Sequence, residues 1–162
     1  MRAFIIGISA AVLFAAAASA QTLPGKPDFS GIWMMDKSRS ESAAQEQPVG
    51  VVRLAITQTG SSLAVETDRD GKTETIVYPI DVEPNGRAEM RGLRRAFWDG
   101  PALINEGSVD IRGQTIAFRE VRMPAADGAE MVVETTLKVE HGYEMRGAQT
   151  VVTGKNVYIR SR

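Results

Sequence analysis

Cysteine is absent from the 162-residue chain, and histidine occurs only once, as His141. Without cysteine the chain can form no disulfide bond and carry no lipid on a cysteine side chain. With a single histidine, the usual ligands of a transition-metal site are also missing. The sequence has no D-x-D-x-D-G loop for calcium either. We therefore expect no metal and no cofactor, and a fold that is held together by packing alone.

Motifs of catalysis are missing as well. There is no G-x-S-x-G nucleophile elbow, and Gly154-Lys155 lacks the spacing of a phosphate-binding loop. His141 precedes a glycine in an expected hairpin turn, where its ring would be solvated. We identify no catalytic residue. A small barrel enzyme that uses inward carboxylates such as Glu74 or Glu144 is the least favoured of our alternatives.

Charge of one sign is not in excess, and only one long apolar stretch is present. The chain has 19 basic and 20 acidic residues, a net charge of −1, so we expect no nucleic-acid partner. The apolar stretch spans residues 3–17, after a positive Met1-Arg2 and before Ala18-Ser19-Ala20. This is the three-part pattern of a secretory signal peptide, and it predicts cleavage after Ala20. An uncleaved anchor is the alternative.

The mature protein would then begin at Gln21 and be periplasmic or secreted. It would keep 142 residues, enough for one domain, with 18 basic and 20 acidic side chains. No later apolar stretch has membrane-spanning length, so we expect no membrane span after cleavage.

The mature chain has two parts. Residues 21–50 form a lead-in, a first strand at 29–35, and a long polar loop at 38–50 with room for one helical turn. From Val51 onward apolar and polar residues alternate, most clearly over 131–140, as in strands with one buried face. Dipeptides that favour hairpin turns separate these segments: Asp70-Gly71, Asn85-Gly86, Asp99-Gly100 and Asp127-Gly128.

This pattern predicts an all-β protein: an antiparallel up-and-down barrel of eight to ten strands, formed by residues 51–162 together with 29–35. Closing the sheet removes its unpaired edges and leaves an interior that can hold one small ligand. A two-sheet sandwich is the alternative. The alternation is lost near Arg119-Glu120, where we expect a β-bulge.

The N-terminal lead-in contains a short motif. Residues Pro27 to Trp33 read P-D-F-S-G-I-W, and this segment resembles the opening of lipocalin-like proteins and of small exported bacterial proteins. The resemblance implies that the indole of Trp33 plugs the closed end of a barrel. It also implies that a basic residue of the last strand, here Arg160, stacks over that indole.

Two sets of residues are candidates for ligand binding. An arginine cluster could meet an acidic group, although at most one of Arg94 and Arg95 can face inward, and a solvated edge strand is the alternative. The cluster comprises Arg87, Arg91, Arg94 and Arg95. The aromatic residues of different strands could form an apolar wall or simply fill the core. They are Tyr78, Trp98, Phe118 and Tyr143.

We therefore expect an exported, non-enzymatic protein that holds a small, largely apolar or amphipathic molecule in the barrel, with Arg94 or Arg95 at any acidic head group. The alternative is a filled barrel that acts as an interaction module for an envelope protein or polymer.

Overall fold

A computed structural model describes residues 25–41, 43, 50, 52–81, 94–111, 113–141 and 151–161. The predicted signal peptide, the Asn85-Gly86 turn, Arg87, Arg91, Tyr143 and Glu144 lie outside these residues, as does the side chain of His141. Nine strands and one 3₁₀ turn, η1 (Lys37–Arg39), are present in the described part. The strands are β1 (Gly31–Met35), β2 (Val52–Gln58), β3 (Ser62–Arg69), β4 (Lys72–Pro79), β5 (Arg94–Asp99), β6 (Ala102–Ile111), β7 (Gln114–Pro124), β8 (Glu130–His141) and β9 (Val151–Arg160).

All nine strands belong to one antiparallel sheet with the order β4-β3-β2-β1-β9-β8-β7-β6-β5. Neighbours in the sheet are neighbours in the chain, except that β1 pairs with β9. The outer strands approach each other through a single parallel bridge between Ile80 and Ala96, where the Asp81 N–H donates to the Ala96 carbonyl at 2.8 Å. The sheet is therefore a nearly closed barrel. This confirms the sequence-based prediction of an all-β barrel.

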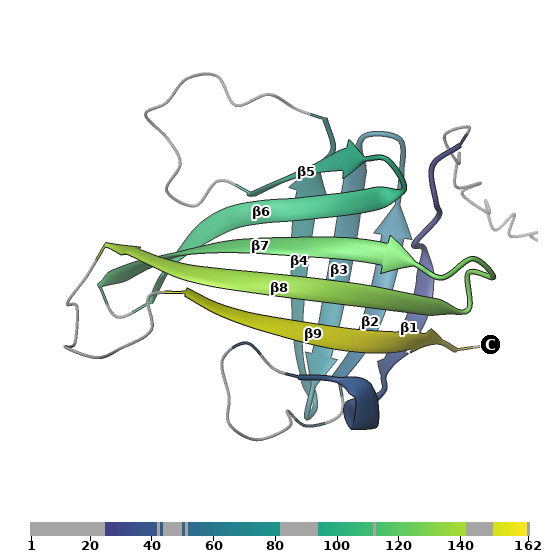
Figure 1. The fold of residues 1–162 in the computed structure, drawn as a ribbon, viewed down its shortest axis with the longest axis horizontal. Coiled ribbons are helices and arrows are strands. Elements are labelled where there is room, and N and C mark those ends of the chain that lie inside the picture. Colours follow the sequence, from purple (N-terminus) through teal and green to yellow (C-terminus); the bar gives the residue numbers. More distant parts are fainter. Residues whose placement is uncertain are drawn as a thin grey trace, which may run out of the picture.

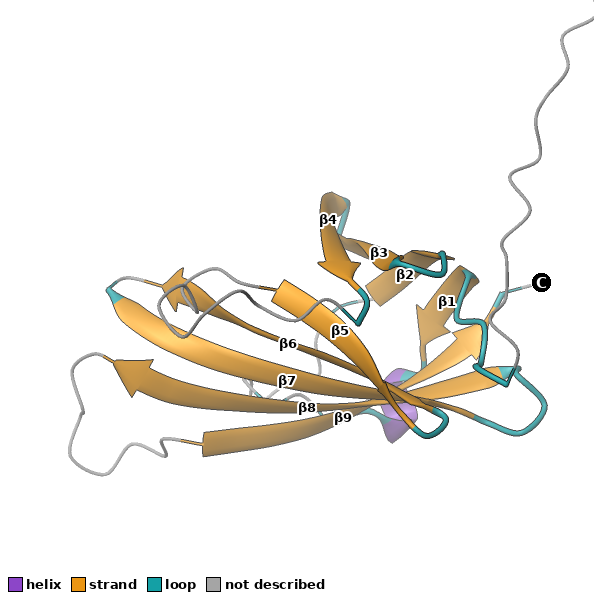
Figure 2. Ribbon diagram, turned by 90° about the horizontal axis from the view of Figure 1, so that it is seen from above, coloured by secondary structure: helices purple, strands orange, loops and turns teal. Residues whose placement is uncertain are grey.

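The strands of the barrel extend unequally toward its two ends. Strands β5 to β9 run across the front of the molecule, and β2 to β4 pass behind them at a steep angle (Figure 1). Seen from above, β1 to β4 stand beside the part of β5 to β9 that is nearer the C-terminus, and β6 to β9 extend beyond them toward the opposite end (Figure 2). The end that carries the C-terminus is called here the closed end.

The closed end is built around Trp33, which is fully buried. Its indole N–H donates to the Phe29 carbonyl at 2.8 Å. The guanidinium carbon of Arg160 lies 4.3 Å from the centre of the indole, a cation–π contact that contributes roughly 0.5–2 kcal/mol. Arg160 also donates to the carbonyls of Asp28, Ser30 and Gly128. Arg160 thus lies over the indole face of Trp33, and the plug role of Trp33 stays a prediction.

The first strand is shorter than predicted. It begins at Gly31 instead of residue 29, because the backbone of the lead-in is bonded by a side chain. The Phe29 N–H donates to Gln58 Oε1 at 3.1 Å, and Gln58 Nε2 donates to the Pro27 carbonyl at 2.9 Å. The helical turn expected in the following loop is η1, which Asp36 caps by accepting from the Ser38 N–H.

The expected bulge at Arg119-Glu120 is wrong. Strand β7 stays in register with β6 and β8 through these residues, and the one register shift lies between Thr115 and Ile116. The apolar alternation is lost for a different reason. Glu120 and Arg122 occupy inward positions, two and four residues after Phe118 on the same face of the strand. Charged residues inside the barrel, and not a change of phase, break the pattern.

Helix is almost absent from the part of the chain that the structure describes. The three residues of η1 are the only helical ones there, and no helix in that part has the length and apolar character needed to cross a membrane.

Candidate functional site

A cavity of about 240 Å³, partly open to solvent, lies between the strands of the barrel, and Trp33 is not among its lining residues. Seven of the nine strands contribute to its wall, all except β5 and β6. The lining residues are Met35, Ala43, Val52, Leu54, Val65, Thr67, Arg69, Ile76, Tyr78, Glu120, Arg122, Val133, Thr135, Leu137, Asn156 and Tyr158. The barrel interior is therefore not filled by side chains.

Strand periodicity explains the composition of this wall. Every second residue of a strand faces the interior, so Val52 of β2 lies beside Arg69 of β3, and Leu54 lies beside Thr67. On the facing wall β8 contributes Val133, Thr135 and Leu137. Valine, leucine and isoleucine supply four of the seven lining residues of β2–β4, although Arg69 of β3 is charged, and the β7–β9 side adds a charged pair and an amide. The cavity consequently has a mostly apolar wall and a more polar wall.

An ion pair lies on the polar wall. Arg122 is only 3% exposed, and its Nη2 lies 2.6 Å from Oε2 of Glu120. The cross-strand neighbours of Arg122 are Leu103 and Val133, which offer it no polar side chain. Its buried Nε has no hydrogen-bond partner among the described residues. A guanidinium in an apolar setting with a donor unused is costly to bury unless something else bonds to it.

Positive charge exceeds negative charge around the cavity. Arg69 also lines it, from the exposed end of β3, and makes no ion pair with another described residue. Glu120 is the one carboxylate in the lining. Two guanidiniums and one carboxylate leave a surplus of one positive charge in the described lining. An anionic group would fit this site electrostatically.

Two buried tyrosines complete the lining. Burial raises the pKa of Tyr78 from its ordinary value of 10.0 to about 12, with a smaller contribution from the nearby carboxylate of Glu120. Burial likewise raises the pKa of Tyr158. Both hydroxyls therefore stay protonated under ordinary conditions and can donate hydrogen bonds to a ligand.

The structure brings two of the predicted aromatic residues together. The rings of Tyr78 from β4 and Phe118 from β7 meet edge to face with centres 6.5 Å apart, next to the gap between β4 and β5. Tyr78 lines the cavity, and Phe118 borders it through this contact. The pair spans the interior between two strands that are far apart in the sheet order.

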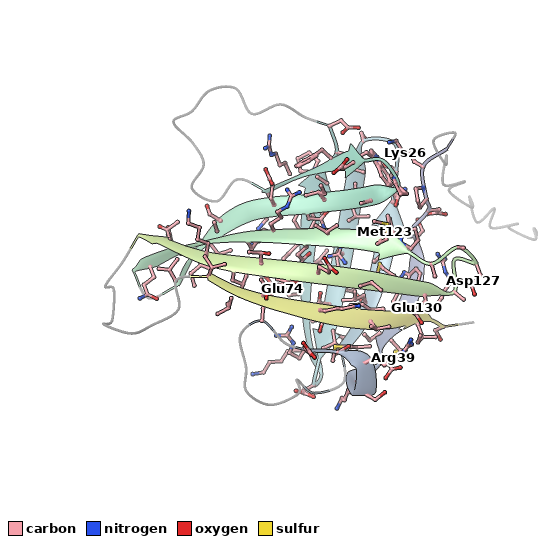
Figure 3. The ribbon with its side chains drawn as sticks, viewed as in Figure 1. Lys26, Arg39, Glu74, Met123, Asp127 and Glu130 are labelled. Atoms are coloured by element: carbon pink, nitrogen blue, oxygen red, sulfur yellow. The ribbon has the colours of Figure 1, made fainter. Side chains whose placement is uncertain are left out.

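Trp98 does not line the cavity. Its ring stacks on Phe29 with centres 6.2 Å apart, and Lys26 Nζ lies 5.2 Å from the ring centre. Lys26 also reaches the turn between β5 and β6, where it donates to the Gly100 carbonyl at 3.2 Å (Figure 3). Trp98 thus packs against the closed end, because its inward position on β5 lies opposite the lead-in.

The two arginines of β5 face opposite sides of the sheet. Arg94 shares the face of Gly107 and Phe118, its neighbours across β6 and β7, and therefore faces the interior. Arg95 lies on the outer face, where it is ion-paired with Glu106 at 2.5 Å. Arg94 is not among the cavity-lining residues, but its charge acts on the Tyr78 hydroxyl.

Sequence reasoning missed Glu120, Arg122 and Asn105. Asn105 is fully buried on β6, next to Glu120 in register, and neither polar atom of its side chain has a partner among the described residues. The available signal was the spacing in β7, where Phe118, Glu120 and Arg122 alternate on one face. Charged residues at apolar-phase positions of a strand indicate a polar feature of the interior.

The described residues contain no group of metal ligands, and Glu74, a carboxylate of the enzyme alternative, does not line the cavity. No group of three or more histidines or acidic residues that could hold a metal ion occurs among the described residues. Glu74 is exposed on β4, on the same face as Ile76 and Tyr78 but outside the cavity lining, and Figure 3 labels it.

Comparison with known proteins finds similarity in fold but not in sequence family. No protein-family model and no curated protein matches the sequence. Among solved structures, the wild-type fluorescent protein UnaG is similar with a TM-score of 0.51 and 16% identity, over 82% of this chain and 97% of that one. The apo form of Caenorhabditis elegans lipid binding protein 8 is similar with a TM-score of 0.51 and 9% identity, over 82% and 95%. At these identities the likeness establishes the barrel fold.

Proposed function

We propose that this protein binds a small, largely apolar or amphipathic molecule non-covalently in the barrel cavity. The observation that carries the proposal is the cavity itself, about 240 Å³ in the barrel of a 162-residue chain. The cavity is partly open to solvent, so a small molecule can enter it and replace its water against the apolar wall. A filled barrel would instead favour the interaction module.

The composition of the lining supports the same proposal. Ligand sites combine apolar walls with a few polar groups that fix orientation. Here Val52, Leu54 and Val65 supply the apolar surface, while Arg122 and Tyr158 supply donors. The volume lies just below the roughly 300–1,000 Å³ of sites for drug-sized ligands. We therefore expect a ligand with a short chain or a single ring.

The likeness to a lipid binding protein agrees with this function, because that protein's name describes the binding of an apolar molecule in the same fold. We further propose kinship with the lipocalin-like exported proteins, which the contact between Trp33 and Arg160 supports.

Export is the second part of the proposal. The N-terminal pattern of residues 1–20 supports cleavage after Ala20 and a periplasmic or secreted protein. Mass spectrometry of the protein recovered from a bacterial expression host tests this directly. A chain that begins at Gln21 in the periplasmic or culture fraction is expected, and an intact Met1 in the cytoplasmic fraction would overturn it.

Binding is tested by isothermal titration calorimetry of residues 21–162 with octan-1-ol, a short apolar chain with one neutral polar group. We expect saturable heat with a stoichiometry of one, together with a negative heat-capacity change from burial of apolar surface. Octanoate and 1-naphthol extend the panel to an anion and a ring. If none of the three gives saturable binding, the proposed function is wrong.

A further inference from the structure

In the ion pair between Glu120 and Arg122, the guanidinium of Arg122 is a carboxylate-binding group, and the protein's own Glu120 occupies it. Glu120 lies two residues before Arg122 on the same face of β7, so its side chain reaches the guanidinium from inside the cavity. Only one guanidinium nitrogen, Nη2, is paired in the described structure, and Nε is left without a partner. A carboxylate that matched the guanidinium fully would bond two nitrogens in parallel.

A polar side chain beside this pair, that of Asn105, also lacks hydrogen-bond partners among the described residues. The amide of Asn105, opposite Glu120 on β6, is fully buried with neither its Nδ2 nor its Oδ1 bonded to a described residue. Buried polar atoms normally have partners, so the unbonded Arg122 Nε in the cavity lining can meet a group that the protein itself does not supply, whereas Asn105 lies outside the lining. One unused donor, Arg122 Nε, thus lies in the cavity lining, and two unused atoms of Asn105 belong to the cross-strand neighbour of Glu120.

The charge of the cavity points to the sign of that group. Arg69 and Arg122 line the cavity with a single carboxylate between them, and Arg94 faces the same interior from β5. One added negative charge would balance the lining. Arg69, exposed at the end of β3, would meet an entering anion first, and Arg122 would meet it at depth.

We propose that Glu120 is a built-in competitor for Arg122, which the head group of an amphipathic monoanion displaces when it enters the cavity. This inference rests on the proposed function and adds the ligand class and the residue that sets the specificity. No covalent bond changes: the guanidinium exchanges one carboxylate for another, and the apolar part of the ligand lies against the β2–β4 wall. The competition makes the affinity for an anion lower than Arg122 alone would give.

The test compares octanoate with octan-1-ol, which have the same chain length and differ in head-group charge, in calorimetric titrations of residues 21–162. Glu120→Gln frees Arg122 and removes a repelling charge, so we expect it to raise the affinity for octanoate about tenfold or more. Its affinity for octan-1-ol should change less than about threefold on the same scale. Arg122→Gln in the Glu120→Gln background should abolish the gain.

Glu106→Gln is the matched control. Glu106 has the same side-chain exposure as Glu120, 25%, and is also ion-paired with arginines, but it lies on β6 and faces the outside of the barrel. Its replacement should leave the affinities for both ligands unchanged. An equal gain in octanoate affinity for Glu106→Gln and Glu120→Gln would show a general charge effect and overturn the inference.

The remaining outcomes separate the inference from the proposed function. If octan-1-ol binds but Glu120→Gln does not strengthen octanoate binding, the inference alone is wrong. If octan-1-ol, octanoate and 1-naphthol all fail to bind the natural protein and every variant, both are wrong. Circular dichroism checks that each variant is folded. If Glu120→Gln does not fold, Glu120→Ala decides, because it also removes the competing carboxylate and the inference requires it to raise the affinity for octanoate about tenfold or more.

Discussion

Gly31 and Arg160 show how single residues build the closed end. Gly31 has a φ of +132°, a backbone conformation that side chains with a Cβ rarely adopt. A Cβ at this position would also lie 3.1 Å from Arg160 Nη1, which donates to the Ser30 carbonyl. The glycine of the G-x-W motif is therefore required both by the turn into β1 and by the close approach of the guanidinium over Trp33.

Gly31→Ala should lower the free energy of unfolding by about 1–3 kcal/mol, the usual cost of a strained backbone conformation. Urea unfolding followed by tryptophan fluorescence measures it. Gly60→Ala is the control, because Gly60 is exposed and a Cβ there would have nothing within 4 Å. That change should leave stability unaltered or raise it by up to about 1 kcal/mol. Equal losses for the two variants would contradict this account.

Tyr78 makes stability depend on pH at the alkaline end. Its pKa is about 12 in the folded protein and near 10 when exposed. Between these values the unfolded chain loses the proton and the folded protein keeps it, so stability is full below pH 10 and falls as pH rises. The slope from this residue approaches about 1.4 kcal/mol per pH unit.

Tyr78→Phe should reduce this loss of stability between pH 10 and 12, when urea unfolding is measured at intervals across that range. Tyr158 remains in the variant and continues to lower stability in the same direction, because its pKa is raised too. The difference between the two proteins therefore isolates Tyr78. Parallel curves for the natural protein and the variant would mean that the hydroxyl ionises equally in both states.

At the scale of elements, the barrel has one short strand and a segment that extends it. β1 pairs with β9 only from Trp33 to Met35, although β9 runs back to Val151. Beyond Met35 the chain continues along β9, and Glu41 exchanges two backbone hydrogen bonds with Lys155 at 2.6 and 2.8 Å. Ala43 then reaches the cavity lining.

Gly154 allows this approach, since a Cβ there would lie 2.3 Å from the backbone nitrogen of Ala43 and 2.7 Å from the Glu41 carbonyl oxygen. Backbone atoms cannot move aside as a side-chain end can. Gly154→Ala should therefore detach the Glu41 segment from β9. We expect a loss of about 1–3 kcal/mol in urea unfolding, the size of two backbone hydrogen bonds. Amide hydrogen exchange should speed up at Glu41 and Lys155, while Val133 on β8 serves as an internal reference. Unchanged exchange at both residues would contradict the prediction.

At the scale of the whole molecule, alternation and turn dipeptides were sufficient to predict the barrel. Of the cavity lining, the candidate residues included Tyr78 but not the charged pair Glu120 and Arg122. The period of two in a strand indicates which residues face inward. It does not indicate which distant strands face each other, because that depends on how the barrel closes. Closure brings Tyr78 against Phe118 and leaves Trp98 against Phe29. The charged pair on β7 was mistaken for a bulge, because a local pattern cannot distinguish a shifted phase from a polar interior position.

A side chain that fills the cavity should affect the stability of the whole molecule and its ligand affinity in opposite directions. Val65 of β3 lines the cavity, on the wall away from the ion pair, and Leu63 lies two residues earlier on the same face, fully buried and outside the lining. Val65→Phe places new atoms in empty space. Leu63→Phe forces them into a packed core, which typically costs about 1–3 kcal/mol.

We therefore expect Val65→Phe to keep or raise the free energy of unfolding, by up to about 1 kcal/mol, since filling a void restores lost packing contacts. The same variant should weaken octan-1-ol binding about tenfold or more, because the ligand and the ring compete for one space. Urea unfolding and calorimetry measure the two effects. Leu63→Phe should instead be destabilised in unfolding. If Val65→Phe were destabilised as much as Leu63→Phe, the space beside Val65 would not be empty. If Val65→Phe bound octan-1-ol with unchanged affinity, the cavity would not be the binding site, since a ligand held there has to lose the volume that the ring takes.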